Sequence, residues 1–138
     1  MSADGGFYAV SDDQLKRLLA GELAHDAFLA GGAGEQPRET HAQAIAVWYE
    51  LSQVLQPEAA CGAAQTDRIP AMAGYSYAHE VQATAASLAT LADADLRSRC
   101  ESAIMEASVA DVLAAVQGLK AFYQRAAAHN DAVLFRVA

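Results

Sequence analysis

Two short apolar runs near the ends of the chain constrain its fold most. Residues 7–10 and 132–137 are rich in aromatic and β-branched side chains, a composition typical of β-strands. An isolated strand leaves its backbone amides and carbonyls without hydrogen-bond partners, and no other segment offers an equally clear match. We therefore expect the two runs to belong to one small sheet, with a mostly helical chain between them.

Three helical patterns are visible in the N-terminal half. The first begins at Ser11 with Gln14 three residues later, an arrangement in which each side chain satisfies a free amide of the first turn, and Gly21 is suited to end it. A short helix is expected over residues 22–30. A third helix is expected to begin with the similar pattern of residues 40–43 and to end before Pro57. The side chains expected to be buried in the second and third helices are Leu23, Ala27, Phe28, Ile45, Trp48, Leu51 and Leu55.

Three further helices are expected in the C-terminal half, begun by Ser76, Asp93 and Ser108. Gly118 interrupts the apolar stripe of the last helix, which predicts close packing against a neighbour, and Asn130 suits a left-handed helix end. Residues 58–75 lack a sustained period and predict at most an irregular or edge strand over residues 68–73. The apolar side chains expected on the three helices are Val81, Ala85, Leu88, Ala92, Leu96, Ile104, Val109, Val112, Leu113, Val116, Leu119, Phe122, Tyr123 and Ala126.

Composition sets the class of protein. A chain of 138 residues with 54% hydrophobic and 19% charged residues predicts a single domain, residues 1–138, with a substantial core. The element order predicts a helix-dominated α+β fold packed around a small sheet that includes both terminal strands. No apolar run approaches the roughly 20 residues of a membrane span, and the start of the chain lacks a secretory leader. These features favour a cytoplasmic protein with no membrane partner.

Four segments together resemble a known family. They are an N-terminal aromatic strand entering AVSDDQLKRLLAGE, then AIAVWYELSQVL, YSYAHEVQATAASLATL, and the ending GLKAFYQRAAAHNDAVLFRV. In this order they are similar to the YfbM-like family of bacterial proteins, a domain family of unknown function. The likeness runs from Phe7 to Val137, and residues 68–74 match it least. The resemblance implies a compact α+β domain and brings no catalytic motif and no cofactor.

The net charge suggests a first hypothesis for function. Nine Lys and Arg against seventeen Asp and Glu give a charge of −8, which disfavours nucleic acid and favours a basic protein partner. The hypothesis is a non-enzymatic binding module, such as an immunity or inhibitor protein of a basic bacterial toxin. The acidic surface would come from Asp12, Asp13, Glu22, Asp26, Glu35 and Glu39.

A second hypothesis is a small-molecule hydrolase or ligand-binding enzyme. Its polar cluster would be Glu39, His41, Asp67, His79 and Glu80. The spacing of these residues matches no zinc motif, so no metal is expected. The two hypotheses differ in geometry, because an enzyme needs such groups to converge in a pocket.

Aromatic pairs leave a pocket open as an alternative to plain core packing. Trp48 and Phe122 are expected in the core from their periodicity, while Tyr49 and Tyr123 are expected to place a hydroxyl at the surface. An aromatic-walled pocket built from these residues is the alternative.

Cys61 and Cys100 generate the first testable prediction. Their positions in an Ala- and Gly-rich loop and on a helix suggest no pairing geometry. Both should therefore be free thiols, and thiol titration of the unreduced, denatured protein should find both. Finding no reactive thiol would contradict the prediction.

Overall fold

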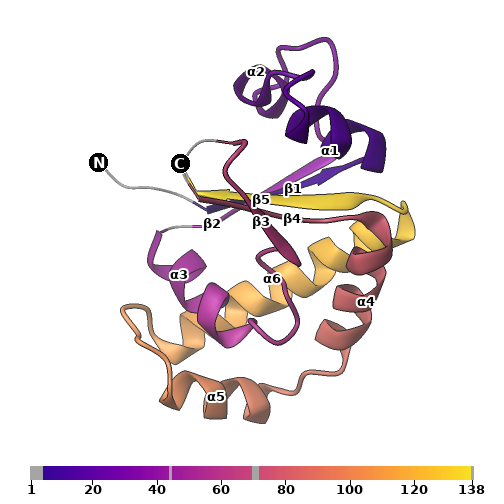
Figure 1. Ribbon diagram of the computed structural model, residues 1–138. Helices are drawn as coiled ribbons and strands as arrows, with labels where there is room; N and C mark the ends of the chain where they lie inside the picture. The colour runs from indigo at the N-terminus through magenta and orange to yellow at the C-terminus, as the bar shows by residue number, and fades with distance from the viewer. Residues whose placement is uncertain (1–4, 44, 70–71, 138) are drawn as a thin grey trace.

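The computed structural model describes residues 5–43, 45–69 and 72–137. They form five strands and six helices (Figure 1). The elements are β1 (Gly5–Val10), α1 (Asp12–Leu19), α2 (His25–Leu29), β2 (Glu39–Gln43), α3 (Ile45–Val54), β3 (Ala64–Thr66), β4 (Met72–Ser76), α4 (Ala78–Ala89), α5 (Asp93–Glu101), α6 (Val109–Ala128) and β5 (Ala132–Val137). No helix among the described residues is both long enough and apolar enough to cross a bilayer.

The terminal strands pair with each other, as the sequence predicts. β1 and β5 run antiparallel at the centre of a single sheet with the order β2-β1-β5-β4-β3. In their register Phe7 lies opposite Phe135, and Val10 lies opposite Ala132. The predicted α+β class and the placement of both terminal strands in one sheet are confirmed.

Helices cover both faces of the sheet. Figure 1 shows α1 and α2 on one face and α3 to α6 on the other. Alternate residues of the central strands enter two separate cores: Phe7 and Phe135 pack with α3 to α6, whereas Val10 and Leu134 pack with α1 and α2. Burial on both faces explains why the terminal strands are continuous apolar runs rather than alternating ones.

Several local predictions are confirmed. Ser11 and Gln14 form the reciprocal capping bonds of α1, and Gly21 follows the helix with φ +77°. Ser108 caps α6, whose end is followed by Asn130 in the left-handed region, φ 55°. A Cβ at Gly118 would lie 3.2 Å from Cε1 of His41, so the glycine permits α6 to approach β2 closely.

The prediction that residues 40–43 begin a helix is wrong. They belong to β2, where Thr40 pairs with Tyr8 and His41 with Phe7. The capping pattern describes a local preference, but pairing with β1 gives the same amides and carbonyls partners from a distant strand. Glu39 and His41 are therefore strand residues rather than helix-start residues.

Two predicted caps are displaced by one residue. Ser76 ends β4, and its Oγ accepts a hydrogen bond from the amide of Ala63 at 2.9 Å. Tyr77 takes the cap position of α4, and its amide donates to Glu80 at 2.9 Å. Ala92, expected on the buried stripe of the preceding helix, is exposed and takes the cap position of α5 in place of Asp93.

Other expected boundaries and burials also differ. The second helix is shorter than residues 22–30, and Ala27 is only half-buried. Strand structure in the region 58–75 is divided between β3 and β4, so the range 68–73 overlaps a strand only at its end. Pro70 lies outside the described residues, and of residues 45 and 46 only the backbone is described. Ile104, expected in the core, is 68% exposed.

Gly74 tests the close packing of β4 beneath the 59–63 turn. An added Cβ would lie 2.2 Å from the carbonyl oxygen of Cys61, so Gly74→Ala should lower the free energy of unfolding by about 1–3 kcal/mol. Chemical denaturation measures this. The control is Gly32→Ala, whose Cβ would lie 3.6 Å from the carbonyl oxygen of Ala27 and should change stability by less than about 1 kcal/mol. Equal effects of the two substitutions would contradict the packing.

Candidate binding site around helix α3

A pocket lies between α3, the 59–62 turn and strands β3 to β5. Its volume is about 290 Å³, near the lower end of ligand-site sizes. We call it the α3 pocket, and its main lining residues are Trp48, Tyr49, Ser52, Cys61, Met72 and Phe135. The alternative of an aromatic-walled pocket thus holds for Trp48 and Tyr49, whereas Phe122 is in the core as expected.

The aromatic walls are inclined to one another. The ring centroid of Trp48 lies 6.2 Å from that of Phe135 at 51°, and Tyr49 meets Trp48 edge-on at 5.8 Å and 77°. Gly5 leaves room for Trp48, because a Cβ there would lie only 2.6 Å from the Cβ of Trp48. Trp48 is half-buried and packs against the main core, so the expectation of core packing holds in part.

The lining residues of the α3 pocket that the structure describes carry no charged side chain. Burial raises the pKa of the Cys61 thiol to about 12, so this group stays protonated at neutral pH. Apart from Trp48 and Tyr49, the other polar residues of the lining are Ser52, Gln56 and Gln65. Because a nucleophilic cysteine must ionise, this lining is suited to binding rather than to thiol chemistry.

The outer face of α3 also holds the loop between α5 and α6. The side-chain amide of Gln53 donates to the carbonyl of Ile104 at 3.0 Å and accepts from its amide at 3.1 Å. Gln53 is one helical turn beyond Tyr49, which places both on the same face of α3. The loop and the pocket therefore adjoin the same helix.

The buried side chain of Glu50 also binds the loop between α5 and α6. Its side chain is 0% exposed, and Oε2 accepts hydrogen bonds from the amides of Glu106 at 3.2 Å and Ala107 at 2.6 Å. Oε1 has no hydrogen-bond partner among the described residues. Neighbouring Ala103, Met105 and Ala107 pack against the core. The loop is thus held on both sides of Ile104, whose side chain points to solvent.

Four of the six acidic residues of the predicted surface bind arginines. Asp13 and Glu35 share Arg17, at 3.0 and 2.6 Å, and the guanidinium lowers the pKa of Glu35. Glu39 pairs with Arg125 at 2.9 Å, and Asp26 with Arg136 at 2.8 Å.

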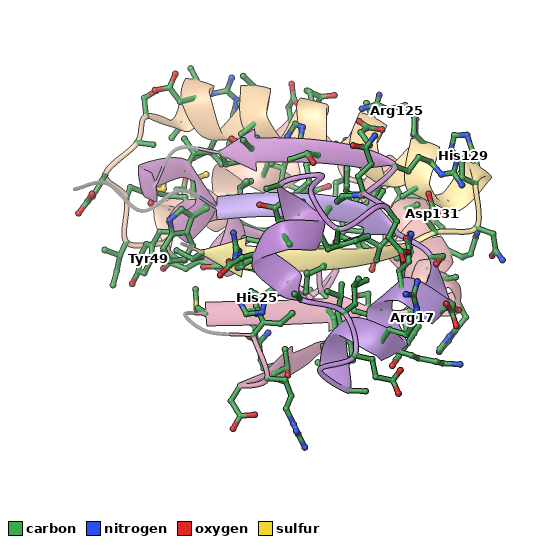
Figure 2. All side chains as sticks on the ribbon, turned by 90° about the horizontal axis from the view of Figure 1, so that it is seen from above. Arg17, His25, Tyr49, Arg125, His129 and Asp131 are labelled. Atoms are coloured by element: carbon green, nitrogen blue, oxygen red, sulfur yellow. The ribbon has the colours of Figure 1, made fainter. Side chains whose placement is uncertain are left out.

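The other two acidic residues differ from each other. Asp12 accepts the amide of Ala78 at 2.8 Å, while Glu22 is exposed. Figure 2 shows Arg17 and Arg125 at the opposite end of the sheet from Tyr49. The predicted acidic residues around these arginines are therefore remote from the α3 pocket, and their charge is largely compensated within the fold.

The predicted Glu and His cluster lies on separate elements. Glu39 and His41 are on β2, Asp67 follows β3, and His79 and Glu80 are in the first turn of α4. Glu80 accepts the hydrogen bond from the amide of Tyr77 at the start of α4. Within the described ranges, no three His, Cys, Asp or Glu side chains are placed to hold a metal ion.

Sequence reasoning missed two features around α3. Ile104 was assigned to the core because it is apolar, although its surroundings, Glu-Ser-Ala-Ile-Met-Glu-Ala-Ser, are typical of a loop. Gln53 gave no signal at all, because its role depends on a residue 51 positions away.

Tyr123 was expected at the surface and is 0% exposed, with its hydroxyl donating to the carbonyl of Ala60.

His41 generates a prediction about pH. Its ring lies 5.7 Å from that of Phe122, and burial lowers its pKa below the ordinary 6.5, with Glu39 opposing and Arg125 adding to the effect. At a pH between the pKa of His41 in the folded chain and its pKa in the unfolded chain, the unfolded chain binds more protons. The free energy of unfolding therefore falls as the pH drops below the ordinary pKa of histidine.

The pH effect of His41 should disappear in His41→Gln. Denaturation experiments between about pH 7 and pH 5 measure this effect. The range lies above the ordinary pKa of 4.5 for the Glu39 carboxyl. His79→Gln, at an exposed position of α4, is the control and should retain the wild-type slope. An unchanged slope in His41→Gln would contradict the assignment.

Comparison with known proteins bears on the fold of the chain. No protein-family model matches the chain, and no curated protein matches its sequence. Among solved structures, it is similar to that of YfbM from Escherichia coli, a protein of unknown function, with a TM-score of 0.69 and 17% sequence identity over 100% of both chains. The expectation from the sequence resemblance is confirmed at the level of architecture: the chain has the YfbM-like fold.

Proposed function

We propose that this protein is a non-enzymatic protein-binding module that docks through the surface around α3. The observation that carries the proposal is the grouping of exposed apolar side chains. Tyr49, Met72 and Ile104 are the large hydrophobic residues exposed in the described part of the chain, at 41%, 43% and 68%. Tyr49 and Met72 line one pocket, and Ile104 is bound by the same helix. We call these three residues the α3 surface.

The fixed position of Ile104 supports a role in recognition. Burying Glu50 with one oxygen unpaired costs free energy. Its other oxygen accepts hydrogen bonds from two amides of the loop that carries Ile104. Holding an exposed isoleucine rigidly reduces the entropy lost when a partner covers it.

Charge near Ile104 indicates the kind of partner. Glu101, Glu106 and Asp111 are all exposed, and residues 100–119 contain no Lys or Arg. Arg99, which precedes this segment, is engaged by Glu58 at 2.6 Å. A protein with an apolar patch bordered by basic residues would complement this surface. Basic enzymes that act on nucleic acid fit that description, so inhibition of such a toxin is the specific role we propose.

Substitution at Ile104 tests the proposal. A partner captured from cell extract should bind Ile104→Ser about tenfold or more weakly, because a central apolar anchor contributes about 1–2 kcal/mol or more. Ile104→Leu is the matched control and should bind like the parent. Since Gln53 holds only the backbone of Ile104, both variants should keep the parent's unfolding curve.

Charge reversal locates the surface. Glu101→Lys with Glu106→Lys should slow association and reduce its dependence on salt. The same change at Asp13 and Glu22, on or beside α1, should leave the association rate near that of the parent. Slower association only in the Asp13 and Glu22 variant would instead favour the acidic surface expected from the first 40 residues.

A further inference from the structure

The α3 pocket differs from the rest of the α3 surface in being concave and walled by rings. Trp48, Tyr49 and Phe135 supply ring faces and edges, and Met72 supplies a thioether. Inclined rings of this kind favour a further ring placed edge-on or offset, and thioether sulfur also makes favourable contacts with aromatic rings. The shape and chemistry of the wall therefore favour a flat guest.

We propose that the α3 pocket binds one uncharged aromatic ring, presented by the protein partner as an exposed Tyr, Phe or Trp side chain. This inference rests on the proposed protein-binding function and names the group that the site would recognise. The pocket would accept a side chain of the partner, whereas the side chain of Ile104 would project into the partner.

The absence of charge on the described lining argues for a neutral guest. Besides Trp48 and Tyr49, its polar residues are Ser52, Gln56, Cys61 and Gln65, and the thiol stays protonated. A charged group entering such a site would lose hydration without gaining an ionic partner. A tyrosine hydroxyl, in contrast, could bond to a glutamine amide at the rim.

The open rim argues for a ring still attached to a protein. Tyr49 and Met72 are 41% and 43% exposed although both line the pocket, so its mouth lies at the molecular surface. A side chain can enter while its backbone stays outside. Tyr49 also lies one turn from Gln53, which binds Ile104, so the same partner can cover both features.

A side-chain analogue tests the pocket without the partner. The chain has one Trp, so Trp48 gives a single indole N–H resonance in a proton–nitrogen spectrum. Titration with p-cresol, the tyrosine side chain, should shift this resonance saturably in the millimolar range. The saturated analogue 4-methylcyclohexanol should bind about fivefold or more weakly, because it lacks the ring electrons. No saturable shift, or equal affinity for both compounds, would overturn the inference.

A filled pocket provides the matching variant. Ser52 is half-exposed, and its Oγ bonds only to the carbonyl of Tyr49 within its own helix, so Ser52→Leu should fold while its side chain blocks the ring. It should bind p-cresol about fivefold or more weakly than the parent, and bind the captured partner more weakly too. Ser98→Leu, the same change at an exposed position of α5, should leave both affinities unchanged.

The outcomes separate the inference from the function on which it rests. If Ile104→Ser loses the partner but p-cresol does not bind, the ring site is wrong and the binding module stands. If p-cresol binds but Ser52→Leu keeps full affinity for the partner, a partner side chain as the source of the ring is wrong. If Ile104→Ser binds the partner like the parent, the proposed function fails whatever the p-cresol result.

Discussion

The pairing of β1 with β5 is the constraint on which the rest of the structure depends. These strands come from opposite ends of the chain and form the centre of the sheet. Each buries side chains on both faces, so neither the α1–α2 layer nor the α3–α6 layer can form its core without them. Closing so long a loop costs chain entropy, which the apolar burial on both faces must exceed.

The two helical layers contribute differently to the site. The layer of α1 and α2 carries the ion pairs of Arg17 and Arg136, which compensate much of its own charge. The layer of α3 to α6 carries Tyr49, Ile104 and the segment without basic residues, while Met72 lies at the adjoining edge of β4. The recognition surface that we propose therefore lies on the other side of the sheet from the helices of the first 40 residues.

The predictions succeeded where one structural preference acts alone. Ser11 and Ser108 cap helices because no strand competes for their backbone groups. Thr40 and Ser76 have equally good capping character, but Thr40 pairs with Tyr8, and Ser76 with Val133. Strand pairing between distant segments leaves no mark within a short window of sequence, so these two errors share one cause.

The candidate site was the least predictable part for a related reason. A pocket walled by Trp48 and Tyr49 was only the alternative to core packing for Trp48 and a surface hydroxyl for Tyr49. Cys61, Met72 and Phe135 join them only through the register of the sheet and the 59–62 turn. Gln53 and Glu50 act on a loop more than 50 positions away. Side-chain type thus suggested two residues of the pocket wall, and only the fold shows which other residues line the pocket with them.

The central strand pair also determines how the protein can be handled. Gly5 is the register partner of Val137, which in turn lies opposite Met72 on the rim of the pocket. A group attached at Gly5 or at Val137 would therefore lie at the same edge of the sheet as the rim of the α3 pocket. Lys16 is exposed on α1, across the sheet from α3. A cysteine introduced at Lys16 would anchor the protein to a sensor surface with the α3 surface facing solution.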